Sequence, residues 1–201
     1  MIIHDFGRYS FTYDLAKNIQ KKGMGVEYMY CRGHDGPNAQ SLEASISDVK
    51  LTSVSGLIKY KRGNFFRRAL FEVFYGFNLS LAIMRAGRGH CLLANTPLIS
   101  SCIVIIMSAS RPVQITWWVQ DVHYLAISNF IGRKSRFLTS LLKIILREIE
   151  RGFIEKCWSY ISISEKFIDE LGLKNNNIVS GIILPNWAPI EEIKLCNKQN
   201  N

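Results

Sequence analysis

The sequence predicts an α/β fold in which helices cover one doubly wound, mostly parallel sheet. Segments with the apolar pattern of strands alternate with segments of helical periodicity almost throughout the 201 residues. The first such segments form a strand–helix–strand unit, whose strands run parallel when the crossover has its usual right-handed sense. Several of the strands also end in polar residues, as expected at the ligand-binding edge of a parallel sheet.

Composition limits the classes of protein that fit. Hydrophobic residues make up 48% and charged residues 20% of the chain, which indicates a folded protein rather than a disordered one. The five cysteines form no Cys-x-x-Cys pair, so the sequence predicts neither a zinc site nor a disulfide framework and favours a reducing, cytoplasmic compartment. Residues 1–5 lack the features of a secretory signal, and the apolar region 92–107 is too interrupted for a membrane span. The net charge of +9 favours anionic partners.

In the first half of the chain, residues 2–3 begin a short strand that leads into a loop at 5–9. A helix at 10–22 places Phe11, Leu15 and Ile19 on one apolar stripe and ends before Gly23. A strand at 25–31 follows. The polar region 32–56 is interpreted as a long loop with one short strand at 49–54.

Residues 57–84 are basic and aromatic, and a helix is predicted from residue 64 onwards. A strand at 91–94, a helix at 98–110 and a central strand at 115–119 come next. Because the segment 98–110 is apolar nearly all round, we expect that helix to be buried.

The remaining elements are a long helix at 133–158, a strand at 160–163, a helix at 165–171 and a strand at 178–184. Ser162 and Glu165 have the spacing of a capping box for the second of these helices. The predicted core stripe of the long helix consists of Leu138, Leu141, Leu142, Ile145, Ile149 and Phe153. We assign residues 1–189 to one domain and residues 190–201 to a polar tail.

Polar residues follow five of the predicted strands, and in a parallel sheet they would share one edge. They are residues 5–9, Asn95 with Thr96, Gln120 with Asp121, residues 162–165, and Asn186. After the central strand, Gln120, Asp121 and His123 supply an amide, a carboxylate and an imidazole. A turn capped by Asp121 and a surface position for His123 are an equally open interpretation.

Several catalytic patterns are absent from the sequence. There is no G-x-G-x-x-G after the first strand, no G-K-[ST] phosphate loop, no H-E-x-x-H and no G-x-S-x-G. Dinucleotide oxidoreductases, nucleoside triphosphatases and α/β-hydrolases are therefore disfavoured.

The basic and aromatic stretch at 59–77 allows three interpretations. The default is a helix whose aromatic face lies in the core while its charges are solvated. The second is a segment that lies on anionic lipid. Binding of single-stranded nucleic acid is the least favoured, because the aromatic residues follow a helical pattern and no recognition motif accompanies the charge.

Four ordered segments resemble the N-terminal half of retaining, GT-B-type glycosyltransferases of the family 4 kind. The family's opening loop, helix and turn resemble the segment that runs from His4-Asp5-Phe6-Gly7 to Lys22-Gly23-Met24-Gly25-Val26. Its next strand exit resembles Ala94-Asn95-Thr96-Pro97, and its central strand resembles Trp118-Val119-Gln120-Asp121-Val122. The end of its domain resembles Ile161-Ser162-Ile163-Ser164-Glu165 and Leu184-Pro185-Asn186-Trp187.

The resemblance implies a Rossmann-like domain that holds the acceptor while a sugar is transferred from a nucleotide-sugar to a glycan acceptor, often lipid-linked, in surface polysaccharide biosynthesis. No metal or other cofactor is implied. Gly7 would let the first loop approach the donor phosphates. Asp121 would orient an acceptor hydroxyl, and the amide of Gln120 excludes a proton-transfer role for that residue. The remaining implied binding residues are Arg8, Tyr9, Asn95, Thr96, His123, Ser164, Glu165 and Asn186.

In this family a second domain holds the nucleotide and carries paired glutamates, whereas this sequence ends at Asn201. We therefore expect that the chain does not transfer a sugar alone. It is either a truncated copy or one half of a split enzyme that works with a separate donor-domain polypeptide. The expected location is the cytoplasm, with peripheral contact to the anionic inner face of the cell membrane. The alternative is a non-catalytic module, derived from that domain, that binds a membrane or a partner protein.

Overall fold

A computed structural model describes residues 1–34, 49–58, 60, 65–87, 89–125, 136–174 and 178–185. Within these ranges the fold is α/β, as predicted, with one sheet in the strand order β3-β2-β1-β4-β5-β6-β7. Every neighbouring pair of strands is parallel. The strands are β1 Ile2–Asp5, β2 Glu27–Cys31, β3 Lys50–Val54, β4 His90–Ala94, β5 Gln114–Val119, β6 Ser159–Ser162 and β7 Ser180–Ile183. The helices are α1 Ser10–Lys21, α3 Phe65–Ala86, α4 Leu98–Ser108, α6 Arg136–Ile154 and α7 Glu165–Leu171.

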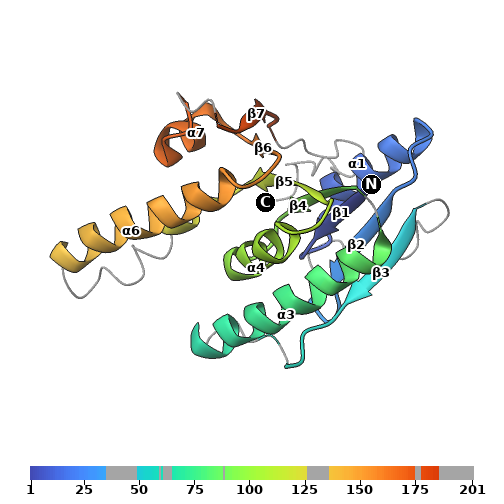
Figure 1. The fold of residues 1–201 in the computed structure, drawn as a ribbon, viewed down its shortest axis with the longest axis horizontal. Coiled ribbons are helices and arrows are strands. Elements are labelled where there is room, and N and C mark those ends of the chain that lie inside the picture. The colour runs from blue at the N-terminus through green and yellow to red at the C-terminus, as the bar shows by residue number, and fades with distance from the viewer. Residues whose placement is uncertain are drawn as a thin grey trace, which may run out of the picture.

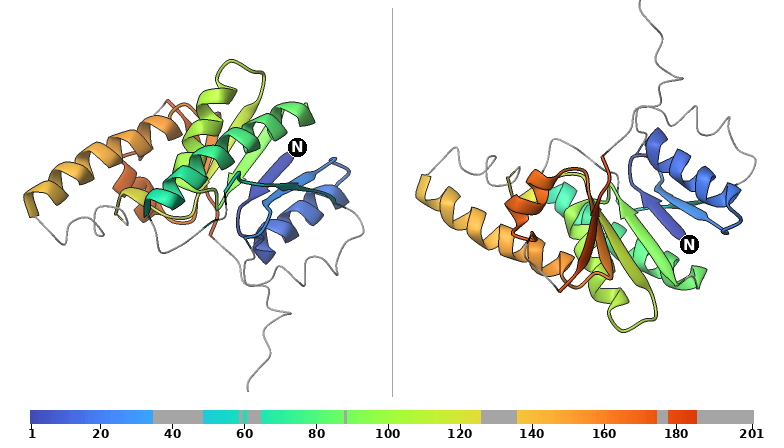
Figure 2. Two further views of the ribbon diagram at one scale, coloured as in Figure 1. Left: turned by 90° about the horizontal axis from the view of Figure 1, so that it is seen from below. Right: turned by 90° about the horizontal axis from the view of Figure 1, so that it is seen from above.

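Two apolar cores lie on opposite faces of the sheet, because successive strand residues point to opposite sides. On one face Leu93 and Trp117 pack with residues of α3, α4, α6 and α7. On the other face Leu92 and Trp118 pack with residues of α1. Figure 2 shows α1 across the sheet from α3 and α4. The apolar stripe predicted for α1 joins the second core, with Phe11, Leu15 and Ile19 packed against it.

Helix α4 is less fully buried than its composition suggests. Ile106 is 57% exposed, and the buried side of the helix carries Ser100, Ser101 and Ser108. These small residues allow α3 to pack closely on α4, and the two helices run side by side in Figure 1. At Gly76 on α3, an added Cβ would lie 3.0 Å from the Cα of Ser100. Small residues are therefore needed on the facing side of α4.

The core stripe predicted for the long helix α6 is wrong in part. Leu141, Ile145 and Ile149 are each about half exposed, while Glu150 and Ile154 are buried. Figure 1 shows the cause, since the N-terminal part of α6 extends beyond the edge of the sheet and only its last turns pack against it. The side chain of Leu138 lies outside the described residues.

The capping box predicted for α7 does not form. Ser162 belongs to β6, and the N-cap residue of α7 is Ser164, without a capping bond from its side chain. The Ser162 hydroxyl instead donates to the carbonyl oxygen of Ser164 at 2.9 Å. The predicted end of the helix is confirmed, because Gly172 closes it in the left-handed conformation at φ 68°.

One helix in the described part of the chain, at Phe66–Ala86 within α3, is long and apolar enough to cross a membrane by length and composition. Its inner side packs in the core through Phe71, Tyr75, Leu79 and Ile83. A core helix of a soluble domain has the same properties.

Candidate functional site

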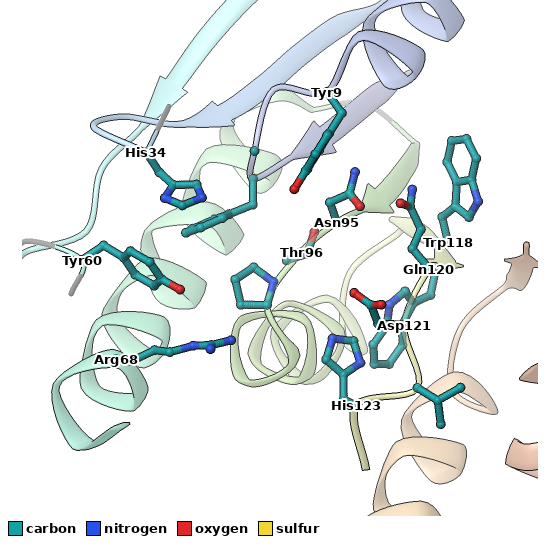
Figure 3. Close-up of a pocket in the computed structure, with 15 residues that line it drawn as sticks. Tyr9, His34, Tyr60, Arg68, Asn95, Thr96, Trp118, Gln120, Asp121 and His123 are labelled. Carbon is teal, nitrogen blue, oxygen red and sulfur yellow. The ribbon is translucent and has the colours of Figure 1, made fainter. Parts of the chain in front are cut away.

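The sheet has its topological switch point between β1 and β4. From β1 the chain proceeds to β2 and β3 on one side, whereas β4 is followed by β5, β6 and β7 on the other. In open α/β sheets, ligands bind beyond the carboxyl ends of the strands at this point. A pocket of about 400 Å³ lies there (Figure 3). The strand exits that line it include Gly7 after β1, Asn95 after β4 and Asp121 after β5.

The loop after β1 is built around the buried carboxylate of Asp5. Its oxygens accept hydrogen bonds from the backbone N–H groups of Gly7 at 3.0 Å and Tyr9 at 2.7 Å. The hydroxyls of Tyr28, at 2.9 Å, and of Thr12 donate to it as well. Burial raises the pKa of the Asp5 carboxyl, and these hydrogen bonds act in the opposite direction. The loop is thus fixed by one side chain at the wall of the pocket.

Two non-glycine residues in the left-handed region mark the neighbouring exits of β1 and β4. They are Arg8, at φ 54°, and Asn95, at φ 50°. Such conformations cost energy for residues with a Cβ and cluster at functional sites. A Cβ at Gly7 would lie 2.5 Å from the ring of Tyr9, so a larger residue there would displace this partly exposed ring from the wall of the pocket.

A group of hydrogen-bonded polar side chains in the core supports the residues that follow β4. The buried ring of His4 makes hydrogen bonds to the Thr96 hydroxyl at 2.6 Å and to the Tyr75 hydroxyl at 2.8 Å. Burial lowers the pKa of His4 to about 3, so its ring is neutral at physiological pH. The hydrogen bond from this group fixes Thr96, which lines the pocket.

The exit of β5 supplies the most polar part of the wall. Gln120, Asp121 and His123 all line the pocket, as do Trp117 and Trp118. The side-chain nitrogen of Gln120 is shielded from solvent and has no hydrogen-bond partner in the described part of the chain. A buried donor without a partner is costly, so a ligand or water group that reached this amide would be bound by it.

His123 is held by Glu150 of α6. Its Nδ1 lies 2.9 Å from the carboxylate, which also accepts hydrogen bonds from the backbone N–H groups of His123 and Tyr124. The side chain of Glu150 is 1% exposed. Sequence reasoning missed this residue, because a single acidic position beside Ile149 in a long helix reads as part of its polar face.

Most residues of the opposite wall were not predicted for the site. Phe6, His34 and Tyr60 form a group of ring contacts, with centroids 4.5 to 5.7 Å apart. Arg68 of α3 lines the same wall, and its Nε donates to Glu72 at 2.7 Å. Tyr60 and Arg68 belong to the basic and aromatic stretch at 59–77. Its composition is compatible with binding, but the sequence did not indicate where its side chains would point.

The structure brings together most of the sequence-predicted residues but not all. Seven line the pocket: Gly7, Tyr9, Asn95, Thr96, Gln120, Asp121 and His123. Arg8 does not line it, and its guanidinium lies over the ring of Tyr30, 4.8 Å from the centroid. Ser164 and Glu165, at the start of α7, are also not among the lining residues. Asn186 lies outside the described residues.

The pocket combines aromatic rings with amide, hydroxyl and carboxylate groups and one arginine. Among the described residues, no group of three or more His, Cys, Asp or Glu side chains is arranged to hold a metal ion. No protein-family model and no curated protein matches the sequence.

Proposed function

We propose that the protein is the acceptor-side domain of a retaining, GT-B-type glycosyltransferase. In this proposal it holds a glycan acceptor, often lipid-linked, for transfer of a sugar from a nucleotide-sugar during surface polysaccharide biosynthesis. The observation that carries the proposal is the pocket at the switch point, where aromatic rings meet hydrogen-bonding groups suited to sugar hydroxyls.

The lining residues match the two kinds of surface that a sugar presents. A pyranose ring has apolar C–H faces, which pack on aromatic rings such as Tyr9 and Tyr60. Its hydroxyl groups both donate and accept hydrogen bonds. Asn95 and Gln120 offer both functions through their amides, and the carboxylate of Asp121 accepts.

The proposal assigns separate roles to the two ends of the pocket. Asp121 orients the acceptor hydroxyl at the exit of β5. The loop from Gly7 to Tyr9 leads into α1, and the backbone N–H groups of the first turn of that helix favour the donor phosphates, since those of Gly7 and Tyr9 donate to Asp5. The nucleotide itself is held by a second, donor-binding domain or polypeptide.

Calorimetric titration of the full chain tests the proposal. The probes are a short-chain polyprenyl diphosphate carrying one sugar, the same lipid without the sugar, and a panel of nucleotide-sugars. Sugar-dependent binding that Asp121→Asn weakens about tenfold or more is expected, because the charge-assisted hydrogen bond from the sugar hydroxyl becomes a weaker neutral one. Asp169→Asn, an exposed carboxylate on α7, is the matched control.

Two outcomes would contradict the proposal. One is the absence of binding by any sugar-bearing probe. The other is equal binding by the wild type and Asp121→Asn, which would remove Asp121 from the site. Sugar transfer is then measured with the chain alone and with an added donor domain of the same family type.

The outer side of α3 favours a second candidate function, docking of a non-catalytic module on the anionic inner face of the membrane. Phe66 is 83% exposed, and Leu70, Phe77 and Leu81 are exposed along the same side of the helix. Arg67 and Arg85 are exposed near its two ends. An apolar stripe with flanking cations is typical of interfacial helices.

Co-sedimentation with vesicles tests this candidate. The vesicles are phosphatidylcholine alone and phosphatidylcholine with phosphatidylglycerol. Binding to the anionic vesicles is expected for the wild type and for Ile182→Ser, which alters an exposed residue on β7. The double variant Leu70→Ser, Phe77→Ser should lose it. Equal binding by all three proteins would exclude α3 as the docking surface.

A further inference from the structure

The inner face of α3 changes from apolar to charged where the helix reaches the pocket. Tyr75 and Leu79 on this face are buried in the core. Glu72, one turn earlier, is buried as well, and Arg68 precedes it by one further turn at the same helical spacing. Arg68 therefore stands where the core ends and the pocket begins. Figure 3 shows its side chain extending from α3 towards the pocket.

The ion pair between Arg68 and Glu72 uses only one edge of the guanidinium group. The Nε of Arg68 donates to Oε1 of Glu72 at 2.7 Å. Within the described part of the chain, the two terminal amino groups of Arg68 have no hydrogen-bond partner. An ion pair that only supports a helix surface has both partners in solvent, whereas here the side chain of Glu72 is 5% exposed and that of Arg68 is 48% exposed. A buried carboxylate thus fixes the direction of an arginine whose outer N–H groups remain accessible.

The charges that line the pocket are divided between its two walls. Among the described residues that line it, Arg68 is the one lysine or arginine and Asp121 is the one aspartate or glutamate. Arg68 belongs to α3, whereas Asp121 follows β5 on the other wall. A negative group is attracted to the first wall and repelled from the second. The pocket therefore favours a ligand with one anionic end and one neutral end that carries hydroxyl groups.

We propose that Arg68 binds a phosphate group carried by the acceptor, so that the acceptor is a glycosyl phosphate or diphosphate rather than a neutral glycan. The inference rests on the proposed function, in which Asp121 orients the acceptor hydroxyl. The two terminal amino groups of a guanidinium lie side by side and match two oxygens of one phosphate. A ligand bound in this way has its reacting hydroxyl at Asp121 and its phosphate at the wall formed by α3.

The donor phosphates are the other source of this charge, and the proposed function places them at the first turn of α1. Helices α1 and α3 cover opposite faces of the sheet (Figure 2). Arg68 and the first turn of α1 therefore approach the pocket from opposite faces. Two separate positions for phosphate fit two substrates that each carry one, and Arg68 is assigned to the acceptor.

Calorimetric titration of the full chain tests the assignment with three probes. The first is a short-chain prenyl diphosphate that carries one sugar, and the second is a neutral alkyl glycoside of the same sugar. The third is a nucleoside diphosphate, which represents the donor phosphates. The wild type should bind the glycosyl diphosphate about tenfold or more tightly than the neutral glycoside, because a charge-assisted pair of hydrogen bonds is added.

The variant Arg68→Gln should lose this preference. Its affinity for the glycosyl diphosphate should fall about tenfold or more, while its affinity for the neutral glycoside should change by less than about twofold. The matched control is Arg85→Gln, which removes an exposed arginine from the last turn of the same helix and should keep the wild-type preference. An undiminished preference in Arg68→Gln would overturn the assignment.

The remaining outcomes separate this inference from the proposed function. If the wild type binds neither sugar-bearing probe, the proposed function itself fails. If it binds both equally, a sugar pocket remains and the phosphate site is refuted. If Arg68→Gln weakens binding of the nucleoside diphosphate as strongly as binding of the glycosyl diphosphate, Arg68 serves the donor and its assignment to the acceptor is wrong.

A second variant covers a loss of stability in Arg68→Gln, which leaves the buried carboxylate of Glu72 without its partner. The double variant Arg68→Gln, Glu72→Gln removes both charges, so no unpaired carboxylate remains in the core. It should show the same loss of preference while circular dichroism reports a folded protein. A folded double variant that keeps the wild-type preference for the glycosyl diphosphate would overturn the role of Arg68.

Discussion

The side-chain amide of Asn95, after β4, donates a hydrogen bond to Oδ1 of Asp5, at the end of β1, over 3.3 Å. The same oxygen accepts the backbone N–H of Gly7 at 3.0 Å. One buried carboxylate thus joins the two strand exits on either side of the switch point. Both exits contain a left-handed, non-glycine residue, so the bonds to Asp5 hold each loop in a conformation that it would not favour alone.

Replacement of Asp5 by alanine should destabilise the protein by about 3 kcal/mol or more, because several buried donors lose their acceptor at about 1–3 kcal/mol each. Urea denaturation of the wild type and the variant measures the loss. Asp14→Ala, on a partly exposed position of α1, is the matched control and should change the stability by less than about 1 kcal/mol. Equal stability of Asp5→Ala and the wild type would show that the carboxylate does not support the loops.

Strain at Asn95 can be measured separately from its hydrogen bond. Asn95→Gly and Asn95→Ala both remove the bond to Asp5, but only glycine adopts φ 50° without a steric cost. The glycine variant should therefore be more stable than the alanine variant by about 1–2 kcal/mol. Thermal unfolding of the two variants gives the difference directly, and a more stable alanine variant would contradict a strained backbone at this position.

Much of the fold follows from the sequence because local patterns report local structure. The alternation of strands and helices, the parallel sheet and the ends of α1 and α7 at Gly23 and Gly172 are all confirmed. The predicted burial along α6 was wrong in part. Apolar periodicity indicates which face of a helix is apolar, but not how far the sheet extends beneath that helix. Ile145 and Ile149 satisfy the pattern and are nevertheless about half exposed.

The pocket could be predicted in part for the same reason. Residues at strand exits, such as Asn95 and Asp121, are located by the parallel topology once the strands are recognised. Arg68 reaches the pocket from the start of α3, and Glu150 holds His123 from near the end of α6. No local pattern distinguishes either residue from a solvated charge. Their placement depends on how α3 and α6 pack, which is a property of the tertiary structure.

The close packing of α3 on α4 makes a sharp prediction for two glycines that both lie inside helices. At Gly76 an added Cβ would lie 3.0 Å from the Cα of Ser100 and from the Cβ of Ile103, whereas at Gly152 nothing lies within 4 Å. Gly76→Ala should therefore destabilise the protein by about 1–3 kcal/mol through overpacking. Gly152→Ala should stabilise it by about 0.5–1 kcal/mol, because alanine is the better helix former.

Guanidinium denaturation of the two glycine variants checks this prediction. Each variant adds one methyl group to a helix, so the helix-propensity gain is shared and the contrast reports the space around the residue. Stabilisation by both substitutions would mean that α3 and α4 are separated more widely than the structure places them.

The buried ring of His4 predicts a loss of stability in mild acid. Burial lowers the pKa of His4 to about 3 in the folded protein, while an unfolded chain binds this proton near pH 6.5. Above pH 6.5 the ring is neutral in both states and its contribution is complete. Below that value the unfolded state binds more protons than the folded state, so the free energy of unfolding falls by about 1.4 kcal/mol per pH unit until the pH approaches 3.

The comparison of wild type with His4→Gln isolates this contribution, because the other titrating groups are shared and cancel in the difference. His4→Gln loses hydrogen bonds to Thr96 and Tyr75, so it should be less stable at pH 7.5. Between pH 6 and pH 4 the advantage of the wild type should shrink by about 1–3 kcal/mol. His90→Gln, which removes an exposed imidazole at the start of β4, shows what a solvated ring contributes over the same range. A difference between wild type and His4→Gln that stays constant from pH 7.5 to pH 4 would mean that His4 binds its proton as readily in the folded protein as in the unfolded chain, which contradicts the lowering of its pKa by burial.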